Sequence, residues 1–161
     1  MKFHFYRLSL ILLTLSLSCK TSQDISDLSQ LKKEFQMDKN PCFGTCPYYT
    51  IIIYEKGYAS FEGKKDVEKM GFHKKKLTKK EYEGIKHAFE SNNFFELKDN
   101  YPSNVPDLPK TTITYNKGDK SKAITGDELS LPSIVKALDK LLSQIAMSDG
   151  WTPQENSENK D

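Results

Sequence analysis

Two cysteines, Cys42 and Cys46, are the residues of this chain whose type and spacing point most directly to chemistry. They stand four positions apart in the segment P-C-F-G-T-C-P-Y-Y, which covers residues 41–49. Such a pair could form a structural disulfide, supply two ligands to a metal ion, or act as a redox couple. Each alternative makes its own demand on the surrounding sequence.

A disulfide requires the chain to turn between the two cysteines. Residues four apart in an extended strand are separated by about 13 Å, whereas a disulfide needs α-carbons within about 7 Å. Gly44 can adopt a left-handed backbone angle where such a turn requires one, and Pro41 and Pro47 favour extended segments on both sides. We therefore predict a Cys42–Cys46 disulfide with Gly44 in its turn.

Metal and redox chemistry fit the sequence less well. A zinc site needs about four ligands, and beyond the N-terminal segment the histidines are His73 and His87, neither of which has the spacing of a zinc knuckle. A redox pair is typically C-x-x-C at the start of a helix, whereas this C-x-x-x-C pair precedes an apolar strand. We expect no metal and keep a thiol–disulfide redox protein as the alternative function.

Hydrolytic chemistry has no recognisable motif in this sequence. Neither G-x-S-x-G nor H-E-x-x-H occurs. Asp66, Glu68, Asp99 and Asp107 could supply carboxylate chemistry, but their spacing selects no pair. We name no catalytic residue and no cofactor, and we favour a non-enzymatic protein while leaving an enzyme open.

The N-terminus has the layout of a signal peptide. Lys2 and Arg7 precede an apolar run over residues 8–17, about half the length that a membrane-spanning helix needs. The run ends in Ser18-Cys19, which resembles a bacterial lipoprotein signal, although Ser16 stands where that signal usually has leucine. We predict a signal peptide over residues 1–18 and a lipid, such as palmitate, on Cys19.

Lipidation of Cys19 would place the protein in the cell envelope. The outer membrane, on its periplasmic or surface face, is favoured over the inner membrane. With Cys19 assigned to the lipid, Cys42 and Cys46 remain as an even pair, and export places them in an oxidising compartment. Residues 19–33 would then be the lipidated N-terminus and its tether.

One domain is expected beyond the tether. The chain has 161 residues, of which 29% are charged and 37% hydrophobic, and its formal net charge is +2. These values indicate a single globular domain, assigned to residues 34–151, followed by a disordered tail over residues 152–161. The small net charge, together with export, argues against nucleic acid as a partner.

Periodicity and turn residues predict two hairpins and two helices. Alternation and central glycines indicate strands at 48–54 and 58–62, then at 110–115 and 120–125, with further strands at 34–38 and 71–77. A capping box, T-K-K-E at 78–81, begins the first helix, and Pro132 begins the second. The predicted fold is an α+β two-layer sandwich, an antiparallel sheet from two hairpins with two helices on one face.

A short internal similarity suggests that the fold could consist of two tandem ββα units. The turns Y-E-K-G at 54–57 and Y-N-K-G at 115–118 lie 61 residues apart, and each hairpin precedes a helix.

Lysine is concentrated in one part of the chain. Residues 64–86 hold nine lysines against four acidic residues. Such a run is usually a solvated face, but on an anchored protein it could contact anionic lipid headgroups or cell-wall polymers. The candidates for that contact are Lys74, Lys75, Lys76, Lys79 and Lys80.

The cysteine segment also carries a family resemblance. P-C-F-G-T-C-P-Y-Y followed by I-I-I-Y-E-K-G resembles the opening of a family of exported bacterial proteins, domain of unknown function 6438, many of which are lipoproteins of Bacteroidetes-type bacteria. The resemblance runs from about Phe35 to Met147 and implies no activity and no catalytic residues. We therefore expect a membrane-anchored binding module whose partner is an envelope protein or polymer.

Overall fold

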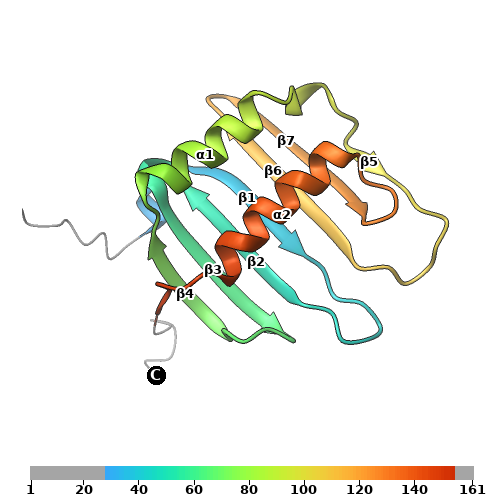
Figure 1. The fold of residues 1–161 in the computed structure, drawn as a ribbon, viewed down its shortest axis with the longest axis horizontal. Helices are drawn as coiled ribbons and strands as arrows, with labels where there is room; N and C mark the ends of the chain where they lie inside the picture. Colours follow the sequence, from blue (N-terminus) through green and yellow to red (C-terminus); the bar gives the residue numbers. More distant parts are fainter. Residues whose placement is uncertain (1–27, 155–161) are drawn as a thin grey trace, which may run out of the picture.

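The computed structural model describes residues 28–154 (Figure 1). The predicted signal peptide, Cys19 and residues 20–27 of the predicted tether lie outside the described residues. Within the described residues, no helix is both long and apolar enough to cross a membrane.

The centre of the fold is one mixed sheet, to which residues 28–154 contribute eight strands in the order β5-β7-β6-β1-β2-β3-β4-β8. Neighbouring strands are antiparallel except β5 and β7, which are parallel. The strands are β1 (Lys33–Lys39), β2 (Tyr48–Tyr54), β3 (Tyr58–Lys65), β4 (Gly71–Lys76), β5 (Asn100–Tyr101), β6 (Lys110–Lys117), β7 (Lys120–Asp127) and β8 (Thr152–Pro153).

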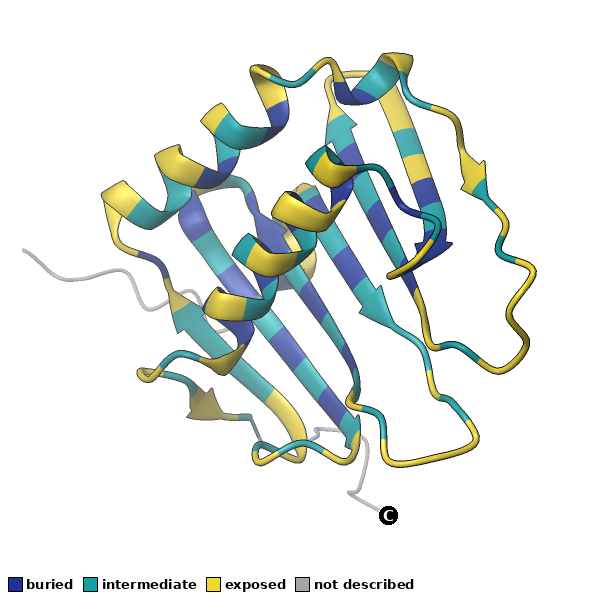
Figure 2. Cartoon of the chain, turned by 45° about the vertical axis from the view of Figure 1, so that its right-hand side comes forward, coloured by how far each residue is buried: buried dark blue, intermediate teal, exposed yellow. Residues whose placement is uncertain are grey.

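Both long helices cover the same face of this sheet (Figure 1). They are α1 (Lys79–Glu90) and α2 (Ser133–Met147), and short 3₁₀ turns lie at η1 (Leu28–Gln30), η2 (Glu55–Gly57) and η3 (Phe94–Glu96). Figure 2 shows buried positions alternating along the strands and lining the helices on the side that faces the sheet.

This alternation follows from strand geometry, because successive side chains point to opposite faces. In β1, Phe35 and Met37 are buried, and in the register they lie opposite Ile53 and Ile51 of β2. Their partners on the other side are Tyr115 and Ile113 of β6. The helices complete the core with Ile85, Phe89, Val135, Leu138, Leu142, Ile145 and Ala146.

The first helix begins at the predicted capping box. The Glu81 amide donates to Thr78 Oγ1 at 3.2 Å, and the Thr78 amide donates to Glu81 Oε2 at 2.7 Å. Two amides that would otherwise lack partners at the helix start are thereby satisfied.

The prediction of a two-layer sandwich built from two hairpins is wrong. The described residues form a larger sheet, in which β1 lies between β2 and β6 and joins the two hairpins, while β4, β5 and β8 extend it. The simple ββα repeat fails as well, because four strands, β1 to β4, precede α1, whereas three, β5 to β7, lie between α1 and α2. Local periodicity does not specify long-range pairing, which is why β1 could be recognised as a strand but not placed.

Two predicted boundaries also differ from the structure. β1 begins at Lys33, inside the predicted tether. Thr152 and Pro153, assigned to the tail, form β8, which pairs with His73 and Lys74 of β4. The rest of the tail prediction, residues 155–161, lies outside the described residues.

Candidate functional site

The cysteine pair forms a disulfide in the connection between β1 and β2. The α-carbons of Cys42 and Cys46 are 5.9 Å apart, and the Gly44 amide donates to Cys42 Sγ at 3.3 Å. Gly44 is not among the glycines with positive φ, so the loop between the two cysteines turns without the left-handed backbone conformation that glycine would allow there.

The disulfide separates two hollows at this end of the molecule. Cys42 and the 93% exposed Phe43 line a small one of about 280 Å³ together with Pro41, Asp107 and Leu108. Cys46 lines a larger one, which we call the α2 groove.

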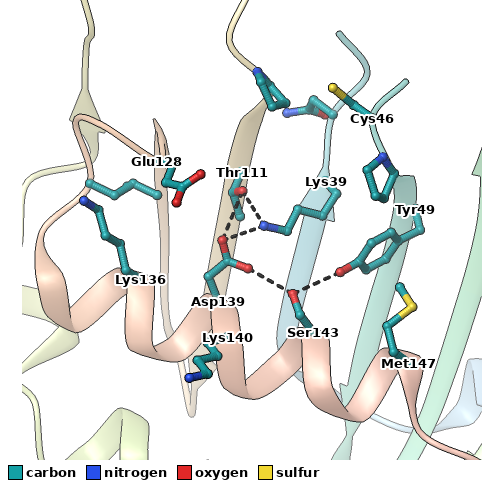
Figure 3. Close-up of a pocket in the computed structure, with 14 residues that line it drawn as sticks. Lys39, Cys46, Tyr49, Thr111, Glu128, Lys136, Asp139, Lys140, Ser143 and Met147 are labelled. Carbon is teal, nitrogen blue, oxygen red and sulfur yellow. Dashed lines mark hydrogen bonds and ion pairs between the residues drawn. The ribbon is translucent and has the colours of Figure 1, made fainter. Parts of the chain in front are cut away.

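The α2 groove has a volume of about 620 Å³ and follows one side of α2 (Figure 3). Its helical wall consists of Lys136, Asp139, Lys140, Ser143 and Met147. Strand ends and loops supply the remainder: Lys39, Asn40, Cys46, Pro47, Tyr49, Pro109, Thr111, Glu128 and Leu131.

The floor of the groove is a network of paired polar groups. Lys39 Nζ lies 2.5 Å from Asp139 Oδ2 and donates to Thr111 Oγ1 at 3.1 Å. On the other side of the carboxylate, Ser143 Oγ donates to Asp139 Oδ1 at 3.0 Å, and the Tyr49 hydroxyl lies 3.1 Å from Ser143 Oγ. Figure 3 shows this chain of contacts running between α2 and the strand ends.

Strand and helix geometry bring these groups together. Lys39 lies two and four positions after Met37 and Phe35, so it points to the same helix-covered face, at the end of β1. Asp139 and Ser143 are one turn apart on α2 and therefore occupy one stripe of the helix.

Tyr49 acts in this network as a neutral donor. Burial raises the pKa of its phenol and nearby Asp139 raises it further, while the hydrogen bond with Ser143 acts in the opposite direction. Because the Ser143 hydroxyl has one hydrogen, which it donates to Asp139, the phenol must donate to Ser143. A phenol with a raised pKa is a poor general base.

A rigid loop holds the end of the groove where α2 begins. Asp127 Oδ1 accepts from the amides of Leu129 and Ser130, each at 3.0 Å, and the Leu131 amide donates to the Asp127 carbonyl. Burial by itself would raise the pKa of Asp127, but these amide hydrogen bonds lower it below its ordinary value. The ionised carboxylate thus fixes the segment that carries Glu128 and Leu131.

The structure does not bring the predicted lysines into one patch. Lys75 is turned under the helix layer, where its side chain is 10% exposed and donates to Ser148 at 2.8 Å. Lys74 and Lys76 lie on the opposite face, across from Ser60 and Tyr58 in the register. Lys79 and Lys80 are exposed in the first turn of α1.

Lys76 is partly engaged as well. Its ammonium lies 3.6 Å from the centre of the Tyr58 ring and donates to the Lys56 carbonyl. Burial and the nearby Lys56 lower the pKa of Lys76. Contact with an anionic surface remains a prediction, for which Lys79 and Lys80 are the best-exposed candidates.

Among residues 28–154, no group of three or more histidine, cysteine, aspartate or glutamate side chains is arranged to hold a metal ion. His73 lies on β4, with its ring 6.3 Å from that of Phe61, and His87 lies exposed on α1.

The sequence prediction missed the polar floor of the groove. Lys39, Thr111, Asp139 and Ser143 belong to no motif. The sequence contained two weak signals. Lys39 continues the alternation of Phe35 and Met37, which are buried, and Asp139 and Ser143 are four residues apart on a helix, beside its apolar stripe. Neither signal shows that the two elements meet.

The fold and its groove define a small domain with one large mixed sheet, two covering helices and a disulfide-closed loop at the groove wall. The profile of the family described as Domain of unknown function (DUF6438) matches residues 33–146, which is more than half of the chain, and the protein therefore belongs to that family. The predicted resemblance is confirmed at this level. Comparison with curated proteins gave no match.

The family match contains nearly the whole candidate site. Of the residues that line the α2 groove, Met147 alone lies beyond the matched range of 33–146. The groove is thus part of the family domain itself rather than of an added terminal segment.

Proposed function

We propose that this protein is a lipid-anchored module of the cell envelope that binds a partner, an envelope protein or polymer, through the α2 groove. The anchor is inferred from Lys2, Arg7, the apolar run at 8–17 and Cys19, all of which lie outside the described residues. The binding role is inferred from the groove.

The observation that carries the binding role is the polar floor of the groove. Lys39, Asp139 and Ser143 satisfy one another, and the pKa of Tyr49 is raised rather than lowered. A catalytic site typically holds a group whose pKa is tuned towards its task, whereas a preformed hollow with a few fixed polar groups is typical of recognition. The groove is better suited to hold a ligand than to convert one.

Photocrosslinking in intact cells tests the binding role. We would replace Met147 by p-benzoylphenylalanine in the full chain, because its side chain lines the groove and is exposed. Lys79 on α1 is the control, since it is also exposed but lies on the other helix. We expect a discrete covalent adduct from the groove position alone; equal adducts at both positions, or none, would refute the proposal.

The anchor is tested separately by Cys19→Ala. Metabolic labelling with an alkyne analogue of palmitate should mark the parent chain and not the variant, and the variant should leave the membrane fraction. Undiminished labelling of the variant would show that Cys19 is not the lipid site.

Thiol–disulfide exchange is a second candidate function, favoured by the Gly44 amide that donates to Cys42 Sγ. Such a contact would also stabilise a thiolate at that position. Equilibration in glutathione redox buffers separates the two functions: a structural disulfide stays oxidised when mildly reducing conditions are applied, whereas an exchange site is reduced and captured as a mixed disulfide.

A further inference from the structure

The charges that line the α2 groove fall into two groups. Lys39 and Asp139 neutralise each other on the floor. Lys136 and Lys140 are exposed, and within residues 28–154 neither has an acidic partner at salt-bridge distance. In Figure 3 neither ammonium group points at Asp139, so both remain available to a ligand.

The length of the groove along α2 indicates the form of that ligand. Its helical wall runs from Lys136 to Met147, which corresponds to about 16 Å along the helix axis. An extended peptide of about five residues has this length.

The spacing of the two free lysines matches such a peptide. Side chains four apart on a helix are about 6 Å from each other. Alternate side chains of an extended strand are about 6.5–7 Å apart and point the same way. Two acidic side chains separated by one residue can therefore meet Lys136 and Lys140 together.

The residue between the two acids would face the opposite wall. That wall presents Pro47, Pro109 and the disulfide sulfur of Cys46, which are apolar surfaces. An apolar side chain at the middle position is thus the best fit.

Other classes of ligand fit less well. Sugars pack their ring faces on exposed aromatic side chains, but the aromatic residue of this groove, Tyr49, is only 2% exposed. An acyl chain would bury the charged side chains of the lining without pairing them. Glu128, exposed near the start of α2, disfavours a ligand with acidic groups along its whole length.

We propose that the α2 groove binds an extended peptide segment of a protein partner, with an acidic–apolar–acidic pattern whose carboxylates pair with Lys136 and Lys140. This inference rests on the proposed function, because it names the ligand class of the same groove.

The test uses capped pentapeptides and the ¹⁵N-labelled mature domain observed by NMR. Gly-Asp-Leu-Asp-Gly should shift amide signals on α2 and around Lys39, whereas Gly-Asn-Leu-Asn-Gly and Gly-Lys-Leu-Lys-Gly should not. The double variant Lys136→Gln, Lys140→Gln should weaken the acidic peptide by roughly fivefold, as two exposed ion pairs would predict. The matched variant Lys79→Gln, Lys80→Gln removes the same charge from α1 and should leave binding unchanged.

Several results would overturn this inference. They are equal binding of the neutral or basic peptide, signal shifts away from the groove, a loss of affinity that is the same in both double variants, or binding of oligogalacturonate in place of peptide. If the amide signals of the groove residues broaden as the protein concentration rises, without any peptide, the groove binds a second copy of this chain instead. If crosslinking from Met147 succeeds while every peptide fails, the binding function stands and the ligand class is wrong; if crosslinking fails, the function itself is wrong.

Discussion

At the scale of single residues, the Lys39–Asp139 pair makes the most specific energetic prediction. Their side chains are 24% and 20% exposed, so the pair is partly shielded from water. A double-mutant cycle with Lys39→Met and Asp139→Asn should give a coupling free energy of about 1 kcal/mol in urea unfolding.

The control for that cycle is the Lys117–Glu90 pair, which has a good distance of 2.8 Å but is far more exposed. Removal of that pair should produce no measurable coupling, because water and salt screen exposed charges. Equal coupling in the two cycles would mean that partial burial at the groove floor adds nothing.

Two glycines should differ in how strongly substitution by alanine changes stability. A Cβ at Gly44 would meet Cys42 Sγ at 4.0 Å, an ordinary contact, and Gly44 does not have positive φ. Gly57 has φ of 73°, and a Cβ there would approach the Tyr82 ring to 3.2 Å. We expect Gly44→Ala to change the free energy of unfolding by less than about 0.5 kcal/mol and Gly57→Ala to cost about 1–3 kcal/mol.

The same comparison shows the limit of sequence reasoning at this scale. A glycine between two cysteines suggested a left-handed turn, but a ring with three intervening residues can close without one. The residue that needs left-handed backbone is Gly57, in the hairpin turn between β2 and β3, where the glycine marked a turn in the sequence but not its contact with Tyr82. A reversed order of alanine effects, measured by thermal unfolding, would show that the backbone assignment is incorrect.

At the scale of elements, the capping box of α1 predicts a pH-dependent contribution to stability. The backbone hydrogen bond from Thr78 lowers the pKa of Glu81, and Lys75 lowers it further, against the opposing effect of burial. A carboxylate whose pKa is lower in the folded than in the unfolded state stabilises the protein at pH values above its unfolded-state pKa. This stabilisation is lost as the pH falls through the folded-state pKa. Glu81→Gln should therefore destabilise the protein at pH 7 and lose this effect between about pH 5 and pH 3.

Thr78→Ala should cost about 1 kcal/mol, because it removes the oxygen that accepts from the Glu81 amide. Thr112→Ala, on the sheet face opposite the helices, is a useful comparison, since its hydroxyl contacts Thr125 and lies far from any helix start. A Glu81→Gln effect that persists unchanged to pH 3 would assign the loss to packing rather than charge.

Elements with strong local signals were predicted, and their arrangement was not. The capping box, the apolar stripe of α2 and the two hairpin turns are encoded within a few residues, so both helices and the four hairpin strands could be located, as could β1 and β4. The position of β1 depends on pairing with Tyr115 and Ile113, nearly eighty residues away, which no local pattern specifies. The groove could not be predicted from local patterns either, because Lys39 and Asp139 come together only when β1 and α2 pack against each other.

At the scale of the whole molecule, the disulfide should contribute to local shape more than to overall stability. A loop of this size removes little entropy from the unfolded chain, so the double variant Cys42→Ser, Cys46→Ser should lose only about 2 kcal/mol and keep the fold. Far-ultraviolet circular dichroism would check the fold and urea unfolding the loss. Failure of the variant to fold would show that the loop is needed to assemble the sheet.

The sulfur of Cys46 and the ring of Pro47 form part of the groove wall, so loss of the disulfide should affect binding more than folding. On the proposed function, the sheet and helix core supplies stability and this end of the molecule supplies recognition.

The central claim is that this end of the molecule, along α2, is the surface through which the protein binds its partner. Its most direct test is the ratio of photocrosslinking yields in living cells from probes at Met147 and at Lys79, each placed in the full-length chain. The account predicts a discrete adduct from position 147 and none above background from position 79. Equal yields at the two positions would contradict it.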